Sequence, residues 1–218
     1  MERYFVLDKF NTWYDWRLIL TAKDVTPPEP KTNYIELDGM SGTLDLSEAL
    51  TGEITYRDRT VTASFWTDEG SRVERSLLLG NIIASLHGRK IKIIEPDDPE
   101  YYFNGRIKIK SSSNTVPYLS FTLEAVCEPW KYAVNETIRT VSVNGSAPVG
   151  AVLNNNGVKT LSPTITVTGA VDIVLDGVQT SLTEGVYKMT NLKLKRGVNV
   201  ISVSGKGSAT FAYREAIL

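Results

Sequence analysis

The only histidine in this 218-residue sequence is His87, and the only cysteine is Cys127. A hydrolase of the triad type uses a histidine as its general base, so any such site has to include His87. One residue of each kind also gives no Cys/His set with zinc-ligand spacing. We interpret His87, at the end of a predicted helix, as structural, because an imidazolium there favours the negative end of the helix dipole. Cys127 lies in an apolar run and is interpreted as a buried small hydrophobic residue.

Four acidic residues lie within residues 95–100, including the adjacent pair Asp97 and Asp98. Such a group is a candidate for binding calcium or for supplying the two carboxylates of a glycosidase. Adjacent carboxylates flanked by prolines are more typical of a solvated hairpin turn, and we favour that interpretation. The glycines are scattered through turns and form no phosphate-binding loop. We therefore predict no catalytic, metal or cofactor site and expect that the chain is not an enzyme.

The composition is that of a globular protein with room for two domains. It contains 42% hydrophobic and 22% charged residues and has a net charge of −1, which argues against a protein that binds nucleic acid. No apolar run approaches the roughly 20 residues needed to span a bilayer, so we predict no membrane insertion. Residues 1–4 do not begin a signal peptide, so we expect synthesis and assembly in the cytoplasm.

The residue pattern changes near residue 132, which predicts two domains, 1–132 and 133–218. The first part is predicted to contain strands around one helix. The helix begins with a capping box, Ser71 and Glu74, and ends at Gly88, a typical left-handed stop. Its predicted apolar stripe, which we expect to pack against a sheet, consists of Val73, Leu77, Leu78, Ile82, Ile83 and Leu86. The predicted strands are 13–23, 34–37, 59–67, 90–94, 101–110 and 118–126, with turns at 96–99 and 111–114.

The second part reads as a series of short strands without any helical signal. Asn144-Gly145 and Asp176-Gly177 are of the type that closes two-residue hairpins, because both positions need positive φ. The predicted strands are 164–168, 171–175, 178–182, 198–204 and 209–213. Even spacing of short alternating strands is typical of a β-sandwich or a jelly roll.

Several segments carry a resemblance to a known family. They are residues 45–52 with 56–59, residues 86–90, residues 96–106, residues 127–132, and residues 194–201 with 211–215. The family's first domain typically closes with a Cys-Asp-Pro-Tyr/Trp-Lys-Tyr signature; this sequence has Cys127-Glu128-Pro129-Trp130-Lys131-Tyr132, with glutamate in the aspartate position. In the right order and spacing over nearly the whole chain, the sequence resembles the distal tail (Dit) proteins of siphophages and prophages of Gram-positive bacteria.

The resemblance implies a mainly β fold. Its N-terminal ring-forming domain would be a β-sandwich or split barrel with one α-helix and a β-hairpin, and its C-terminal domain a galectin-like β-sandwich. It also implies a structural virion protein at the distal end of the tail, forming a hexameric ring. Its partners would be further copies of itself, the tail tube protein, the tail-associated lysin or tail-fibre hub, and the receptor-binding proteins.

Two segments are our candidates for contacts in a ring or with a partner, namely residues 38–52 and 96–105. The candidate residues are Asp38, Gly39, Thr51, Gly52, Asp97, Asp98, Tyr101 and Tyr102. An alternative function is a carbohydrate-binding module or adhesion adaptor acting through the second domain. Only Tyr187, Phe211 and Tyr213 supply aromatic rings there, which weakens this alternative. A peptidoglycan-degrading enzyme is disfavoured, because the sequence has no nucleophile or metal constellation.

Overall fold

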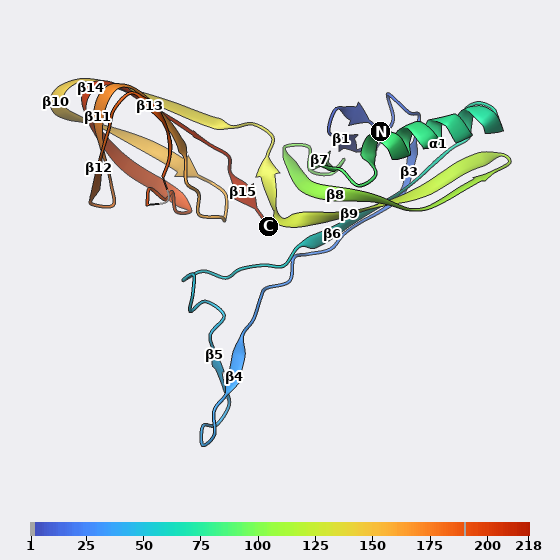
Figure 1. Ribbon diagram of the computed structural model, residues 1–218, viewed down its shortest axis with the longest axis horizontal. Helices are drawn as coiled ribbons and strands as arrows, with labels where there is room; N and C mark the ends of the chain where they lie inside the picture. The colour runs from blue at the N-terminus through green and yellow to red at the C-terminus, as the bar shows by residue number, and fades with distance from the viewer. Residues whose placement is uncertain (1–2, 190) are drawn as a thin grey trace. The chain divides into compact units, whose positions relative to one another are not determined.

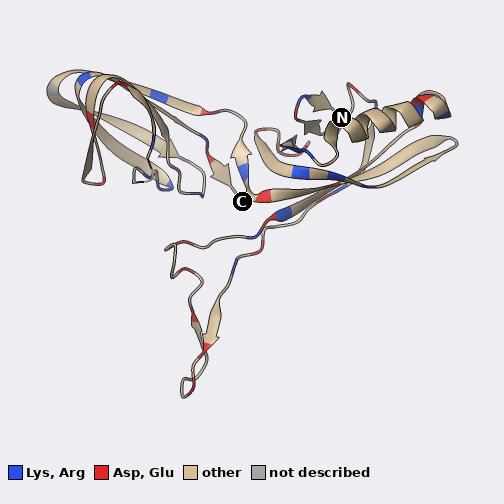
Figure 2. Ribbon diagram, viewed as in Figure 1, with Lys and Arg blue, Asp and Glu red and all other residues tan. Residues whose placement is uncertain are grey.

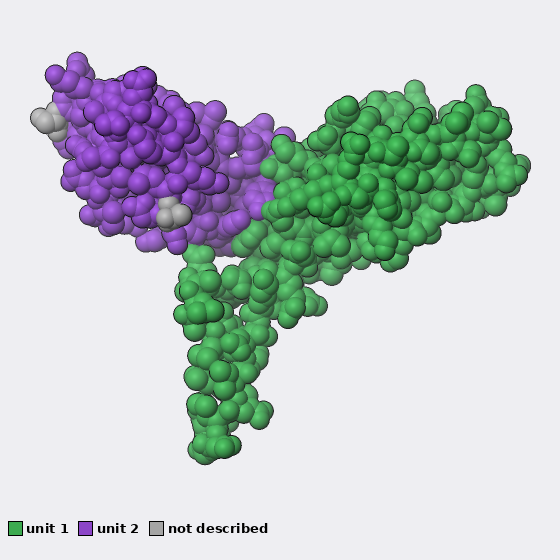
Figure 3. All heavy atoms as spheres, in the orientation of Figure 1, with its two compact units in different colours: residues 1–131, 218 green, residues 132–217 purple. Residues whose placement is uncertain are grey.

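The computed structural model describes residues 3–189 and 191–218 and divides the chain into two compact units. One consists of residues 1–131 with Leu218, the other of residues 132–217 (Figure 3). Each unit has its own cluster of buried hydrophobic side chains. Met1 and Glu2, which begin the stretch examined for a signal peptide, and Thr190 lie outside the described residues. Within the described residues, no helix is long and apolar enough to cross a membrane.

The chain is mainly β (Figure 1). The strands that begin in the first unit are β1 (Val6–Leu7), β2 (Phe10–Asn11), β3 (Ile19–Val25), β4 (Tyr34–Glu36), β5 (Thr43–Asp45), β6 (Arg59–Thr67), β7 (Lys90–Ile94), β8 (Tyr101–Thr115) and β9 (Tyr118–Ala133). Helix α1 (Arg72–Leu86) connects β6 to β7. The strands of the second unit are β10 (Thr137–Asn155), β11 (Thr164–Leu175), β12 (Val178–Leu182), β13 (Gly185–Lys188), β14 (Gly197–Tyr213) and β15 (Ala216–Ile217).

The main sheet of the first unit has the strand order β2-β1-β7-β8-β9-β6-β3. Strand β6 alternates as predicted, with Val61, Ala63 and Phe65 buried on one face, because successive side chains of a strand point to opposite faces. Phe5, just before β1, packs edge-on against Phe65 with the ring centroids 6.0 Å apart. Since β1 and β6 are not neighbours in the sheet, this contact means that the sheet curls around its core.

Helix α1 covers the inner face of this curled sheet (Figure 1). The predicted capping box is confirmed: the Ser71 hydroxyl accepts from the Glu74 amide, and the Glu74 carboxylate accepts from the Ser71 amide at 2.7 Å. Gly88 follows the helix with φ +77°. Ile82 and Leu86 are fully buried, and burying side chains of this kind contributes about 1.5–3 kcal/mol each.

Two predictions for the first unit are wrong. Residues 13–16 form a turn, and the strand predicted over 13–23 starts only at Ile19. The reversal is local: Arg17 has a positive φ of 52° and its amide donates to the Trp13 carbonyl. The turn predicted at 111–114 is strand, because β8 continues to Thr115 and the chain reverses at Val116-Pro117. The antiparallel succession of β7, β8 and β9 is as predicted.

The second unit is built on one sheet with the order β10-β14-β11-β12, and β13 pairs with the first half of β11. Its buried side chains come from alternate positions of the long strands, as in Ile165, Ile173 and Phe211. The pairs predicted as separate strands, 164–168 with 171–175 and 198–204 with 209–213, are single strands, β11 and β14.

Glycines let β11 and β14 pass closely where these two strands continue through the predicted breaks. A Cβ on Gly207 would lie 1.8 Å from the Thr168 carbonyl oxygen, and one on Gly205 would lie 2.4 Å from that of Ala170. Gly169 has φ +78°, which L side chains rarely adopt. These positions look like turns in the sequence, but here they allow two strands to continue side by side.

The two predicted hairpin turns of the second unit have opposite outcomes. Asp176 and Gly177 connect β11 to β12 with φ values of 51° and 78°, as the prediction required. Asn144 and Gly145 do not form a turn: they lie inside β10, opposite Lys206 and Gly205. The register shifts just after Gly145, so the glycine accommodates a bulge in a long strand.

Candidate functional site

The segment between β3 and β6, residues 26–58, leaves the sheet as an extended arm (Figure 1). Its base continues the β3–β6 ladder: the Thr26 amide donates to Thr60 at 3.0 Å, and the Lys31 amide donates to Thr55 at 2.8 Å. Farther out, β4 and β5 pair as an antiparallel hairpin. Backbone hydrogen bonds therefore hold the arm together along much of its length.

The arm exposes apolar side chains that a folded chain normally buries. Leu50 is fully exposed and Leu37 is 48% exposed. Five other large hydrophobic side chains of the arm are also exposed, namely Tyr34, Ile35, Met40, Leu44 and Ile54. Extended exposed apolar surface of this kind marks protein contacts more often than it marks free surface. The arm is therefore a candidate contact surface.

Four of the predicted contact residues lie on this arm. Asp38 and Gly39 lie in the turn between β4 and β5, where Gly39 has φ +86°. Thr51 and Gly52 lie in a second turn, in which the Gly52 amide donates to the Glu48 carbonyl at 2.7 Å. The structure thus places these four residues at exposed turns of one projecting element.

The acidic segment 95–100 is tied into a network of ion pairs. Glu95 is buried and accepts from Lys23 and from Lys131, the latter at 3.0 Å. Asp97 pairs with Lys23 at 2.7 Å, and Asp98 pairs with Lys131 at 2.9 Å. Within the described residues, no group of three or more His, Cys, Asp or Glu side chains could hold a metal ion. Glu95, Asp97 and Asp98 thus connect the segment between β7 and β8 to β3 and β9.

Charge pairing lowers the pKa of two of these carboxyls, Glu95 and Asp97. Burial alone would raise the pKa of Glu95, but hydrogen bonds from Lys23 and Lys131 outweigh it and lower that pKa below its ordinary value. Hydrogen bonds from Lys23 and Arg3 likewise lower the pKa of Asp97. A glycosidase acid needs a raised pKa, so these two carboxyls are tuned in the opposite direction.

Tyr101 and Tyr102 begin β8 directly after this network. Both are partly buried, and the Lys92 ammonium lies 5.0 Å from the centroid of the Tyr102 ring, within the range of a cation–π contact. The predicted contact residues therefore fall into two separate places, the arm and the connection between β7 and β8.

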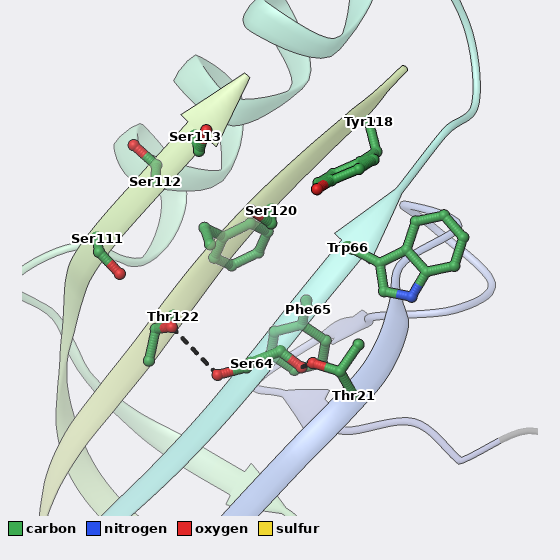
Figure 4. Close-up of a pocket in the computed structure, with 11 residues that line it drawn as sticks. Thr21, Ser64, Phe65, Trp66, Ser111, Ser112, Ser113, Tyr118, Ser120 and Thr122 are labelled. Carbon is green, nitrogen blue, oxygen red and sulfur yellow. Dashed lines mark hydrogen bonds between the residues drawn. The ribbon is translucent and has the colours of Figure 1, made fainter. Parts of the chain in front are cut away.

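The outer face of the main sheet is hollowed by a trough of about 600 Å³ (Figure 4). Its polar lining consists of Thr21, Ser64, Ser111, Ser112, Ser113, Ser120 and Thr122, and its aromatic lining includes Trp66 and Tyr118. Ser64 and Thr122 are hydrogen-bonded to each other at 3.1 Å. The lining contains hydroxyls and rings but no acid, base or histidine. Such a trough suits packing or binding, because its lining holds no base that could activate the hydroxyls.

Five basic side chains form a second feature of the outer face, which we term the basic face. They are Lys90, Lys92, Arg106, Lys108 and Lys110, all exposed on β7 and β8. In the sequence these five residues alternate with residues that point into the core, and this period-two pattern is the signal that could have identified the basic face.

The predicted stripe of α1 is divided between two faces of the helix. Leu78, Ile82 and Leu86 pack toward the core, whereas Val73 and Leu77 are 69% and 65% exposed. The prediction that all six apolar residues face the sheet is wrong, because their spacing covers more of the helix circumference than one sheet contacts. An uncovered apolar strip remains on the outside of α1.

His87 and Cys127 hold structural positions. The His87 Nδ1 accepts from the Ile109 amide at 3.1 Å, joining the end of α1 to β8. Cys127 is fully buried in β9, and burial raises the pKa of its thiol to about 12. A reactive cysteine needs a lowered pKa, so this thiol is inert in the folded chain.

Comparison with known proteins gives a likeness of fold. No protein-family model matches the sequence, and no curated protein matches it. Among solved structures, the crystal structure of the SPP1 Dit protein matches with a TM-score of 0.70, covering 99% of both chains at 15% sequence identity. That protein is described as a paradigm of the hub of the adsorption apparatus in phages that infect Gram-positive bacteria. The chain therefore has the fold of SPP1 Dit.

Proposed function

We propose that this chain is a non-catalytic structural hub of a bacteriophage tail. The observation that carries the proposal is the likeness to SPP1 Dit, which extends over 99% of both chains. A likeness of this extent includes both units of the chain and is not limited to a single β-domain of a widespread type. The trough without acid or base, the inert thiol and the ion-paired carboxylates also support a role in assembly.

The finer features of the role belong to the same proposal. Residues 1–132 form a hexameric ring at the distal end of the tail, and residues 133–218 form an outward, galectin-like domain. The ring links the tail tube protein to the tail-tip lysin or fibre hub and to the receptor-binding proteins. Asp38, Gly39, Thr51 and Gly52 contribute contacts from the arm, and residues 97–102 contribute contacts from the β7–β8 connection.

The carbohydrate-binding alternative gains no support from the second unit. Phe211 and Tyr213 are buried in its core. The Tyr187 hydroxyl donates to the Thr183 carbonyl at 3.0 Å, and its ring is partly buried against the core. A sugar platform normally presents exposed aromatic rings.

The test is the solution mass of the full chain, measured by size exclusion with light scattering across the micromolar range. We expect a stable species near six times the 24.2 kDa chain mass. A strictly monomeric chain that also fails to assemble when mixed with its tail tube protein would refute the hub proposal.

A further inference from the structure

The arm carries an excess of negative charge. Between β3 and β6 there are seven acidic residues and two basic ones, and Figure 2 shows the acidic positions spread along the arm. The acidic residues are Glu29, Glu36, Asp38, Asp45, Glu48, Glu53 and Asp58, and all seven are exposed. The arm thus presents apolar and acidic side chains together.

The basic face carries the opposite charge. Lys90 lies opposite Arg106 in the β7–β8 ladder. Lys90 pairs with Glu128 at 2.6 Å, and Lys110 pairs with Glu124 at 2.7 Å. Two carboxylates against five cations leave an excess of positive charge on this part of the sheet.

The two surfaces lie on different parts of the same unit. The arm leaves from β3 and β6, whereas the basic face lies on β7 and β8, and β9 separates β8 from β6 in the sheet. Figure 1 shows the arm leading away from the sheet. A copy of the chain therefore offers an acidic projection and a basic surface that its own arm does not cover.

We propose that the basic face is the docking surface for the acidic arm of a second copy of this chain. This inference rests on the proposed self-assembly and names the surfaces that meet in it. The charges fix the register and speed the encounter, because complementary potentials steer association. The exposed apolar side chains of the arm supply buried area once the arm is docked.

Charge reversal on each side tests the pairing. One variant carries Asp38→Lys and Glu48→Lys on the arm, a second carries Lys92→Glu and Lys108→Glu on the face, and a third carries all four changes. We expect each two-site variant to weaken self-association about tenfold or more, because like charges then meet. The four-site variant should recover to within about threefold of the wild type. A matched control, Lys188→Glu with Lys193→Glu in the second unit, should leave self-association unchanged.

Zero-length carbodiimide cross-linking of mixed ¹⁴N- and ¹⁵N-labelled chains provides a second measurement. We expect mixed-isotope cross-links between arm carboxylates and Lys92 or Lys108. Association of the wild type without these cross-links, or without rescue in the four-site variant, overturns the docking inference and leaves the hub proposal standing. Loss of self-association in the face variant, with the arm variant unaffected, means that another acidic surface of the second copy docks on the basic face, and this also overturns the docking inference. A wild type that stays monomeric both alone and when mixed with its tail tube protein overturns both.

Discussion

Removing the charge of Glu95 should destabilise the first unit. In Glu95→Gln the shape of the side chain is kept, but an amide cannot neutralise Lys23 and Lys131. Removing one partner of a buried ion pair costs about 3–5 kcal/mol, because the other charge is left uncompensated. Lys23 keeps Asp97 and Lys131 keeps Asp98 in this variant. We therefore expect the free energy of unfolding to fall by about 3 kcal/mol, the low end of that range.

Urea unfolding followed by tryptophan fluorescence measures this loss. All four tryptophans lie at or before residue 130. The fluorescence signal therefore reports on unfolding of the first unit, irrespective of when the second unit unfolds. The matched control is Glu100→Gln, which changes an exposed carboxylate in the same segment. An exposed substitution of this kind should shift the free energy of unfolding by less than about 0.5 kcal/mol.

The dependence on pH gives the prediction a second readout. The folded pKa of Glu95 lies below its ordinary value of 4.5. Its contribution to stability is therefore fully present above that value and is lost as the pH falls through the lower folded pKa. The difference in the free energy of unfolding between wild type and Glu95→Gln should stay constant from about pH 7 to about pH 5 and become smaller below pH 4.5. A difference below about 0.5 kcal/mol at pH 7, or one that persists unchanged to about pH 3, would refute the reasoning.

Three further predictions concern single residues. Ser71→Ala removes the cap of α1 and should lower the free energy of unfolding in urea by about 1 kcal/mol. The control Ser76→Ala, at an exposed position of the same helix, should leave this free energy nearly unchanged. Gly105→Ala places a Cβ 2.3 Å from the Cys127 sulfur, and we expect overpacking to lower the free energy of unfolding by about 1–3 kcal/mol. The loss should be smaller when Cys127 is also replaced by alanine, and equal losses in the two backgrounds would contradict this reasoning. The Cys127 thiol should react with Ellman's reagent only at the rate of unfolding, so rapid labelling of the native chain would contradict its burial.

Local features of the fold were predictable because neighbouring residues determine them. The Ser71 and Glu74 cap, the alternation in β6 and the Asp176-Gly177 turn each depend on a few consecutive side chains. The long strands of the second unit were not predictable in this way. Gly145 and Gly207 signal turns locally, and only the partner strand, remote in sequence, shows that they lie inside ladders.

The candidate contact residues stay a prediction, and only their local structure followed from the sequence. Turn chemistry predicts the reversal at Asp38-Gly39, which lies in the turn between β4 and β5. The sequence did not show that the flanking strands carry this turn away from the core on an arm. The basic face was visible as alternating lysines, Lys90 with Lys92 and Lys108 with Lys110, but its meaning depends on which face of β7 and β8 is covered.

Ordering the arm costs conformational entropy that its own contacts repay poorly. Fixing a residue costs about 1–2 kcal/mol, and burial of apolar side chains is the main term that offsets this cost. Leu50 is fully exposed and Leu37 is about half exposed, so little of that compensation is available within one chain. A heterologous contact between identical copies needs two different surfaces on each copy, one that projects and one that receives. The acidic arm and the basic face are two such surfaces, and their opposite charges select one way of joining them.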